Sequence, residues 1–360
     1  MRDSIKKYFL SLMTDDPKAR GPIAGILRWF FYELSFIYGS VLAIARTSAK
    51  PYRPRRCKVI SVGNITLGGT GKTPLVAAIA RTLRDKGRKV VILTRGYMAD
   101  GKTGLADEAE FFRKTLGGIP VIVGRDRAAS AREAEAKYSP DVLLLDDGFQ
   151  HWNLARDLDI VTIGVNDPFG NGMLIPRGTL REPVSSLKRA GIAVITKVLP
   201  DMSSLGKAEI VRAALKDINP GMDVFNASYE PCRLHDVAGG YETDTGSING
   251  RPVALLCAIG DPGSFEDTVV STGAFIGASY YFIDHHIFTA AEIDKIAKEC
   301  KGKGIDTIVT TEKDLPRIKN ANASWALPDT AGVRILALSV DMKIDREEQL
   351  FGRLDTVLNS

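Results

Sequence analysis

The chain has 360 residues, 44% hydrophobic and 25% charged, which predicts a folded protein with room for two domains. Its four cysteines are far apart and form no C-x-x-C pair, which argues against a zinc site or a disulfide framework and fits a cytoplasmic protein. The net charge of +5 is uneven, because residues 1–56 alone carry 11 Lys/Arg and 4 Asp/Glu, a net +7. A basic arm of this kind predicts an anionic partner; no nucleic-acid-binding motif accompanies it, so we expect a membrane surface and no nucleic acid.

Apolar side chains recur at helical spacing between residues 21 and 46, which predicts a helix. Arg28 and Glu33 disfavour a membrane span, because each central charge costs about 3 kcal/mol in a bilayer. A helix in the membrane interface, a helix packed on the protein body and a true span all stay open. We expect the first, with residues 1–46 as a membrane-interface region anchored by the aromatic cluster around Trp29. No cleavage site follows, so no signal peptide is expected.

Residues 47–222 alternate apolar, strand-like runs with helical stretches, which is typical of a parallel sheet covered by helices on both faces. The predicted strands are 58–62, 89–94, 119–124, 141–146, 159–164 and 192–197. Residues 223–251 are strand-like and then rich in glycine and turn residues, which predicts a β-hairpin linker. Residues 252–360 predict a second, smaller α/β domain. The fold class is therefore α/β, with a P-loop-type parallel sheet flanked by helices.

A glycine-rich loop follows the first predicted strand and precedes a helix. Its residues GGTGKT are Gly68, Gly69, Thr70, Gly71, Lys72 and Thr73. Strand, loop and helix in this order are typical of a P-loop, whose backbone N–H groups bind phosphates. We expect Lys72 to reach the β/γ-phosphate oxygens of a nucleoside triphosphate and the Thr73 hydroxyl to bind Mg²⁺. Thr66 stands where the usual pattern has its first glycine, so the prediction depends on the strand and helix around the loop.

Two aspartates end the apolar run DVLLLDD at residues 141–147. A carboxylate at the carboxyl end of a strand beside a phosphate loop is the Walker B arrangement. We expect Asp146 to hold Mg²⁺ directly or through water, with Asp147 as the second member of the metal site.

Several further motifs occur along the same chain. Together with VGNITLGGTGKTP they are LTRGY (93–97), DE (107–108), DDGFQH (146–151), NGMLIPRGTLRE (171–182), DHH (284–286) and TTEKD (310–314). This combination resembles the tetraacyldisaccharide 4'-kinase family over the chain up to about residue 318. The resemblance implies two α/β/α domains and ATP-dependent phosphorylation of the 4'-hydroxyl of a tetraacylated glucosamine disaccharide 1-phosphate. It also implies a peripheral protein at the cytoplasmic face of the bacterial inner membrane, with no obligate protein partner evident.

The resemblance also implies roles for particular residues. Asp107 matches the family's proposed base, although its setting here is ADEA, and His285 matches the partner of that base; whether His285 or His286 serves stays open. Arg181 in TLRE is the expected positive group for a phosphate, with Arg177 close behind. A carboxylate oriented by a histidine can accept the proton of a sugar hydroxyl.

Two other functions stay open. A P-loop GTPase or ATPase that assists metal or cofactor insertion would use GGTGKT and TTEKD, but the His/Cys runs typical of such proteins are missing. A membrane-bound nucleotide sensor would need Lys72 and Asp146 but not Asp107, His285 and Arg181. The preference for ATP over GTP, and a contact between TTEKD and the base, also stay open.

Overall fold

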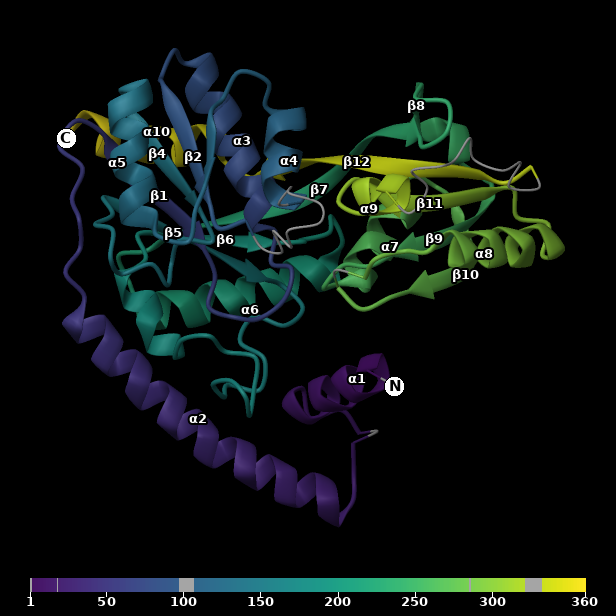
Figure 1. Ribbon diagram of the computed structural model, residues 1–360, viewed down its shortest axis with the longest axis horizontal. Coiled ribbons are helices and arrows are strands. Elements are labelled where there is room, and N and C mark those ends of the chain that lie inside the picture. The colour runs from purple at the N-terminus through teal and green to yellow at the C-terminus, as the bar shows by residue number, and fades with distance from the viewer. Residues whose placement is uncertain (1, 18, 97–106, 285, 321–331) are drawn as a thin grey trace. The chain divides into compact units, whose positions relative to one another are not determined.

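The computed structural model describes residues 2–17, 19–96, 107–284, 286–320 and 332–360. The chain forms two compact units (Figure 1). Unit 1 comprises Met1–Ser228 together with Lys343–Ser360, and unit 2 comprises Tyr229–Met342. The strands β7 (Asp223–Asp236) and β12 (Arg334–Ile344) contain residues of both units.

Unit 1 is built on a parallel sheet. Its strands are β1 (Lys58–Gly63), β2 (Val90–Thr94), β3 (Val121–Val123), β4 (Val142–Asp146), β5 (Leu158–Gly164), β6 (Ile192–Thr196) and the start of β7, in the order β3-β2-β4-β1-β5-β6-β7. Every neighbouring pair in this sheet is parallel, which confirms the predicted fold class. The helices are α1 (Arg2–Met13), α2 (Pro22–Ser48), α3 (Lys72–Asp85), α4 (Asp107–Thr115), α5 (Arg127–Tyr138), η1 (Val184–Arg189), α6 (Met202–Ile218) and α10 (Glu347–Asn359).

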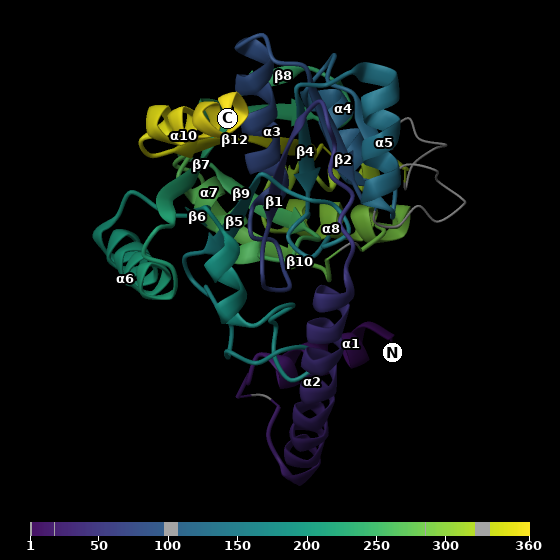
Figure 2. The same cartoon turned by 90° about the vertical axis from the view of Figure 1, so that its left-hand side faces the viewer.

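Helices cover both faces of this sheet because its strands are apolar on both sides. On one face Ala131 and Ala134 of α5 pack on Val59, Leu143 and Leu145. Figure 2 shows α3 on the opposite side of β1, β2 and β4 from α5. The strands therefore lie in a dry core, with their ends and connecting loops free to form a site.

Unit 2 is a smaller α/β unit with strands β9 (Pro252–Cys257), β10 (Phe275–Tyr281), β11 (Thr307–Thr311) and most of β12, in the order β10-β9-β11-β12. The pairs β10–β9, β9–β11 and β11–β12 are parallel. Its helices are α7 (Pro262–Val270), α8 (Ala290–Gly302) and α9 (Leu315–Asn320). The predicted hairpin corresponds to β7 and β8 (Glu242–Asp244), which pair antiparallel before the short turn η2 (Thr245–Ile248).

The end of the chain differs from the predicted domain 252–360, because Lys343–Ser360 belong to unit 1. The backbone N–H of Asp345 donates to the carbonyl of Asn226 at 2.9 Å, and the Asp345 carboxylate accepts from the Asn226 N–H at 2.7 Å. In α10, Leu350 and Leu354 are fully buried. The boundary was misplaced because a helix that follows the last strand of one sheet carries no local signal for the unit on which it packs.

The helix predicted for residues 21–46 is α2, which begins at Pro22 and has 27 residues. Its inner face holds Ala24, Phe31 and Ser35, which are buried. A Cβ added at Gly39 would lie 2.9 Å from Leu174 Cδ1, so α2 packs closely on the loop that follows β5. None of the described helices has the length and apolar character that crossing a bilayer requires.

Candidate active site

The glycine-rich loop leaves β1 at Gly63 and enters α3 at Lys72. Gly68 and Gly71 have φ angles of +107° and +81°, which glycine adopts without the steric cost of a side chain. No side chain caps α3, so the first N–H groups of this helix point into the loop without a side-chain acceptor. This backbone forms the anion-binding start of a helix that the sequence predicts.

The side chain of Thr70 has a structural role in this loop. Its hydroxyl lies 2.7 Å from the Thr162 hydroxyl, and its carbonyl accepts from Thr196 Oγ1 at 2.9 Å. Lys197 Nζ donates to the Gly69 carbonyl at 2.5 Å. These contacts fix the loop to β5 and β6, so Thr70 can meet a phosphate through its backbone N–H but not through its hydroxyl.

Four charged or polar side chains meet beside the loop. Arg181 donates from Nη1 and Nη2 to the two carboxylate oxygens of Asp147 at 2.7 and 3.0 Å. Lys72 Nζ lies 3.7 Å from Asp147 Oδ1. Both cations also donate to Asn64 Oδ1 at 3.2 Å. The structure thus brings Lys72, Asp147 and Arg181 together, although they lie far apart in sequence.

This arrangement keeps Asp147 ionised. Burial alone would raise the pKa of its carboxyl, but Lys72 and the Arg181 fork outweigh burial and hold that pKa well below its usual range. Asp147 adopts a left-handed φ of +55°, which turns its side chain away from the line of β4. The sequence predicts Asp147 only as a member of the metal site. The structure shows a second role, because Asp147 holds Lys72 and Arg181.

Asp146 is the last residue of β4 and is 1% exposed. Its backbone carbonyl accepts from Arg127 Nη2 at 3.2 Å, and Arg127 Nη1 donates to the carbonyl of Gly124. Thr73 is the second residue of α3, directly after Lys72. Asp146 and Thr73 therefore stand at the carboxyl end of β4 and at the start of α3, where the sequence predicts them.

A second layer of contacts supports the cluster. Gln150 Nε2 donates to the Asn64 carbonyl at 2.9 Å and to Glu182 Oε1 at 3.0 Å. Glu182 is 2% exposed and also accepts from Arg189 Nη2 at 2.7 Å. The Arg189 guanidinium lies 3.5 Å from the centroid of the Phe149 ring. These contacts hold the DDGFQH and TLRE motifs against each other.

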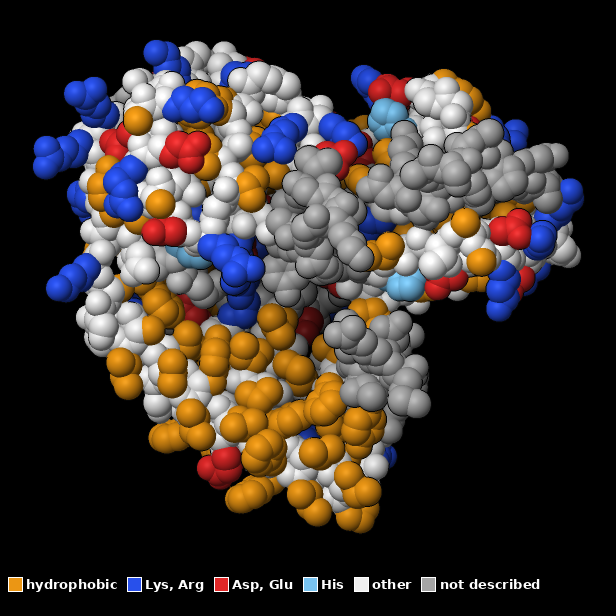
Figure 3. All heavy atoms as spheres, viewed as in Figure 1, with side chains coloured by type: hydrophobic (Ala, Val, Ile, Leu, Met, Phe, Trp, Pro, Cys, Tyr) orange, Lys and Arg blue, Asp and Glu red, His pale blue; other side chains and the backbone are white. Residues whose placement is uncertain are grey.

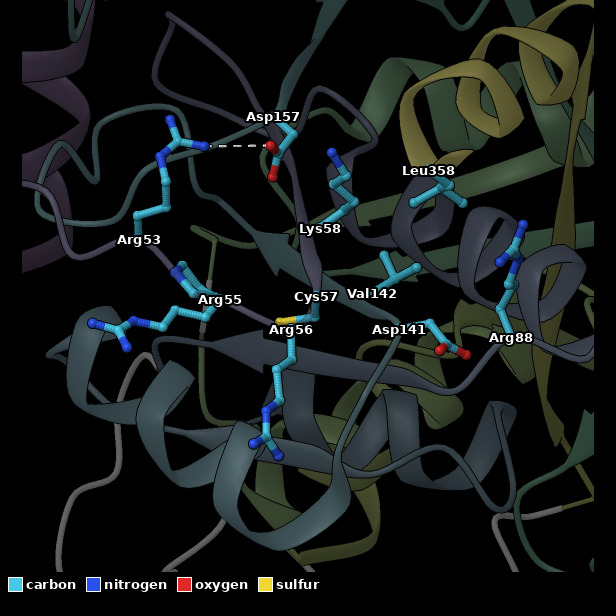
Figure 4. A pocket seen from close by; sticks show the side chains of 11 residues that line it. Arg53, Arg55, Arg56, Cys57, Lys58, Arg88, Asp141, Val142, Asp157 and Leu358 are labelled. Carbon is cyan, nitrogen blue, oxygen red and sulfur yellow. Dashed lines mark hydrogen bonds and ion pairs between the residues drawn. The ribbon is translucent and has the colours of Figure 1, made fainter. Parts of the chain in front are cut away.

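A separate cavity of about 340 Å³ lies at the opposite end of the same strands. It is lined by Lys58 and Val142, the first residues of β1 and β4, and by the basic residues Arg53, Arg55, Arg56 and Arg88. At about 3.3 Å per residue, Lys58 lies about 17 Å along β1 from Gly63. In Figure 4 the Arg55 and Arg56 side chains extend in different directions.

Comparison with known proteins agrees with the geometry. The model of a family described as tetraacyldisaccharide-1-P 4'-kinase matches residues 27–359. The chain belongs to this family.

Named relatives and a solved structure support the assignment over most of the chain. A tetraacyldisaccharide 4'-kinase of Halothermothrix orenii is 32% identical, covering 95% of this chain and 96% of the relative. Another, of Anaeromyxobacter dehalogenans, is 38% identical, covering 80% and 78%. The crystal structure of LpxK from Aquifex aeolicus in complex with ATP is 27% identical, with a TM-score of 0.66 over 92% of this chain and 99% of that one. The chain is thus a tetraacyldisaccharide-1-phosphate 4'-kinase, and the GTPase and sensor alternatives are not favoured.

Two predicted catalytic residues of this kinase stay untested. Asp107 is the first residue of α4, but its side chain lies outside the described part of the chain. His285 lies outside the described residues altogether. The Asp107–His285 pairing therefore stays a prediction.

The neighbouring motif residues of unit 2 have partners within that unit. His286 Nε2 lies 3.2 Å from Glu292 Oε2, and its ring stacks on Phe282 with centroids 4.5 Å apart. Lys313 Nζ lies 3.5 Å from Asp284 Oδ1, which joins the TTEKD and DHH motifs. Asp314 is fully buried and accepts from the Ala258 N–H at 3.0 Å. Asp314 therefore serves the fold of unit 2.

The role of Asn64, which joins Lys72 to Arg181 through one amide oxygen, was not predicted. The only available signal was its position inside VGNITLGGTGKTP, directly after the strand that leads into the loop. Arg127, which binds the β4 end, was missed as well, because an arginine at the start of a helix has no pattern of its own.

Proposed function

We propose that unit 1 transfers the γ-phosphate of ATP to the 4'-hydroxyl of its acyl disaccharide 1-phosphate at a membrane surface. The observation that carries this proposal is the cluster of Lys72, Arg181 and Asp147 beside an uncapped glycine-rich helix start. Phosphoryl transfer needs positioning and neutralisation of charge more than covalent chemistry from the protein. Lys72 and Arg181 meet at Asp147 beside the backbone N–H groups of the loop, and together these groups would supply positioning and neutralisation of charge.

Different residues would bind the phosphates, neutralise their charge and accept the proton of the sugar hydroxyl. The N–H groups of residues 68–73 would bind the β- and γ-phosphates, and Lys72 would neutralise the transferring group. Arg181 offers a planar fork that suits two phosphate oxygens and would exchange its Asp147 partner for phosphate when ATP binds. Asp147 keeps both cations in place before ATP arrives. Asp107, with His285 as its partner, is the proposed acceptor of the sugar proton.

The donor set also fits Mg²⁺. This ion prefers oxygen ligands and usually takes one or two carboxylates, with water and substrate phosphates completing the shell. Thr73 and Asp146 supply such oxygens, and Asp147 is the third candidate. Among the described residues no group of three or more His, Cys, Asp or Glu is placed to hold a metal ion. When bound, the ion would neutralise charge on the transferring group.

The proposed membrane surface is the outer face of α1 and α2. Figure 3 shows apolar side chains concentrated over these two helices. The exposed members are Phe9, Leu10, Ile23, Ile26, Trp29, Phe30, Phe36, Ile37, Val41 and Ile44. A patch of this extent marks an interaction surface. Arg28 lies 3.3 Å from Asp15, so its charge is paired within the protein and does not oppose contact with lipid.

We infer that the enzyme binds peripherally at the cytoplasmic face of the inner membrane, because its donor, ATP, is cytoplasmic and its acylated acceptor is held in a bilayer. The apolar face of α2 and the basic segment 1–56 together give the apolar and electrostatic attraction that interfacial helices use. The surface faces lipid, so the proposal needs no protein partner.

The direct test is transfer of label from [γ-³²P]ATP to the acyl disaccharide 1-phosphate in mixed micelles. We expect labelled lipid that carries the phosphate at the 4'-position, and slow ATP turnover when the acceptor is left out. Nucleotide turnover of equal rate with and without the acceptor would point instead to a GTPase or ATPase of another class.

A further inference from the structure

One loop joins the membrane-facing helices to the phosphate site. This bridging loop, residues 171–182, follows β5 and lies beside α1 and α2 in both views (Figures 1 and 2). Ser35 Oγ lies 2.8 Å from the Leu174 carbonyl and 2.8 Å from the Phe31 carbonyl of its own helix, which share its one proton, and it accepts from the Arg177 N–H at 2.9 Å. The Tyr38 hydroxyl donates to the Arg181 carbonyl at 3.0 Å. Two side chains one turn apart on α2 therefore fix the backbone of the bridging loop at three points.

The turn between α1 and α2 fixes the same loop through charge. The Asp15 carboxylate accepts from Arg177 Nη2 and Nη1 at 2.9 and 3.3 Å. Asn171 Nδ2 donates to Asp15 Oδ2 and to the Met13 carbonyl, both at 2.9 Å. Arg28 Nε lies 3.3 Å from Asp15 Oδ1. Asp15 thus connects the turn between α1 and α2 to the start and middle of the bridging loop.

The other end of the bridging loop is bonded to the phosphate loop. The Leu67 N–H donates to the Thr179 carbonyl at 2.7 Å, and the Arg181 N–H donates to the Ile65 carbonyl at 2.6 Å. The side chain of Arg181 then turns to Asp147 and Asn64. The carbonyl of Arg181 contacts α2, its N–H contacts the phosphate loop, and its guanidinium lies in the cluster. A small shift of α2 must therefore move this residue.

We propose that Ser35 and Tyr38 are positioning residues through which seating of α2 on lipid sets the guanidinium of Arg181 for phosphoryl transfer. The helix is packed on the bridging loop by polar contacts on one face and presents an apolar face on the other. Lipid that binds the apolar face restrains the helix, and the three hydrogen bonds carry that restraint to Arg181. The enzyme is then most active where its acceptor is found. This inference rests on the proposed membrane surface.

Two observations support a donor role for Tyr38. Its hydroxyl has a carbonyl partner, so it must carry its proton to make the bond. Burial raises the pKa of that hydroxyl, which keeps it protonated throughout the neutral range. Tyr38→Phe removes the donor and keeps the ring. Tyr32→Phe, one and a half turns earlier on α2, is the matched control, because the Tyr32 hydroxyl has no partner in the described part of the chain.

The kinetic test compares these variants on acceptor presented in vesicles. Loss of one hydrogen bond predicts a kcat about 3- to 10-fold lower for Tyr38→Phe, with vesicle binding and the KM for ATP unchanged. Tyr32→Phe should match the wild type. In an Arg181→Lys background Tyr38→Phe should cause no further loss of kcat, because the guanidinium that Tyr38 positions is absent. A wild-type kcat for Tyr38→Phe, or an equal loss in both backgrounds, overturns the inference.

Hydrogen exchange gives a test that needs no activity. We expect the amides of Leu67 and Arg181 to exchange more slowly when vesicles of anionic phospholipid are added to the wild type, and faster in Tyr38→Phe than in Tyr32→Phe. Unchanged exchange at both amides on vesicle binding overturns the coupling. If the wild type transfers no phosphate to the lipid, the proposed function is refuted. If transfer is normal but exchange at Leu67 and Arg181 does not change, only the coupling between lipid binding by α2 and the position of Arg181 is refuted.

Discussion

At the scale of single residues, the site is a set of charges that neutralise each other until substrate arrives. Asp147 is held between Lys72 and Arg181, and Asn64 accepts from both cations. Leaving one of these charges buried without its partner costs far more than the net gain of the pair. The cluster is therefore preorganised, and we expect Asp147 to keep Lys72 as its partner when an anionic phosphate takes its place on Arg181.

The proposed base is tested by a double-mutant cycle. We expect Asp107→Ala and His285→Ala each to lower kcat by about 10²–10⁴, the usual range for a general base. If the two residues act as one unit, the double variant should be little worse than the poorer single variant. Steady-state kinetics on the lipid acceptor, with ATP binding measured separately, checks this. Fully additive losses would contradict the pairing. His286 would then be a poor substitute for His285 as the partner of Asp107, because Glu292 and Phe282 hold its ring.

His151 predicts a pH dependence of stability. Burial and the nearby charge of Arg127 lower its pKa from 6.5 to about 4. Between these pH values the unfolded chain binds a proton that the folded chain does not, so His151 makes the protein less stable as the pH falls from 6.5 to 4. We expect His151→Gln to make the unfolding free energy, measured from urea midpoints, less dependent on pH over that window. The reduction in slope should correspond to at most one proton per molecule. The control is His235→Gln in unit 2. Parallel curves for wild type and His151→Gln would refute this effect.

At the scale of elements, the end of β1 determines how closely the two halves of the site approach. A Cβ at Gly63 would lie 2.5 Å from Phe149 Cβ and 2.7 Å from its backbone nitrogen. Only glycine therefore lets β1 pass the DDGFQH segment at this distance. The phosphate loop and the segment that carries Asp147 are brought together by this missing side chain.

Gly63→Ala should therefore destabilise unit 1 by about 1–3 kcal/mol, the usual cost of overpacking. The matched control is Gly164→Ala at the end of the neighbouring strand β5, where an added Cβ meets nothing within 4 Å. That variant should be neutral or stabilising by up to about 1 kcal/mol, because alanine restricts the unfolded chain. Urea midpoints at constant m-value measure both. Equal midpoints for the two variants would contradict the close packing.

The outer face of α2 should bind membranes through its largest exposed side chains. Trp29 is 65% exposed and Phe36 is 75% exposed. The double variant Trp29→Ser/Phe36→Ser should weaken vesicle binding by about tenfold per residue and raise the apparent KM for lipid, while the KM for ATP stays unchanged. Co-sedimentation with vesicles and kinetics check this. Met202→Ser/Ile210→Ser on α6, at 85% and 73% exposed, is the control. Equal losses in both pairs would show that the loss is not specific to the outer face of α2 and would contradict the proposed membrane surface.

The sequence predicted the elements well where the hydrophobic periodicity of a segment agrees with the glycine, proline and other turn residues at its ends. The strand before the phosphate loop and the strand that ends at Asp146 were both predicted within one residue of their observed bounds. The meeting of Arg181 with Asp147 was not predicted, because it depends on how the bridging loop folds back on the phosphate loop. The inward hydroxyl of Thr70 was missed for a similar reason, since its partner Thr162 lies on another strand.

At the scale of the whole molecule, the kinase consists of two α/β units, with the phosphate loop and the helices α1 and α2 in the same one. The chain returns from unit 2 to unit 1 at Lys343, and α10 then packs on unit 1, with Lys86 paired to Asp355 at 2.7 Å. Unit 2 is therefore inserted between two parts of unit 1. Its DHH and TTEKD motifs form a contact of their own through Asp284 and Lys313.

The central claim is that the carboxyl ends of the unit 1 strands, and not their amino ends, carry out phosphoryl transfer to the lipid. Transfer of label from ATP to the acyl disaccharide 1-phosphate by two lysine variants of one strand–loop segment tests it most directly. Lys72→Ala should lower transfer by at least about 10²-fold, whereas Lys58→Ala, at the amino end of β1, should transfer at the wild-type rate. Near-normal transfer by a stably folded Lys72→Ala protein, or equal losses in both variants, would contradict the account.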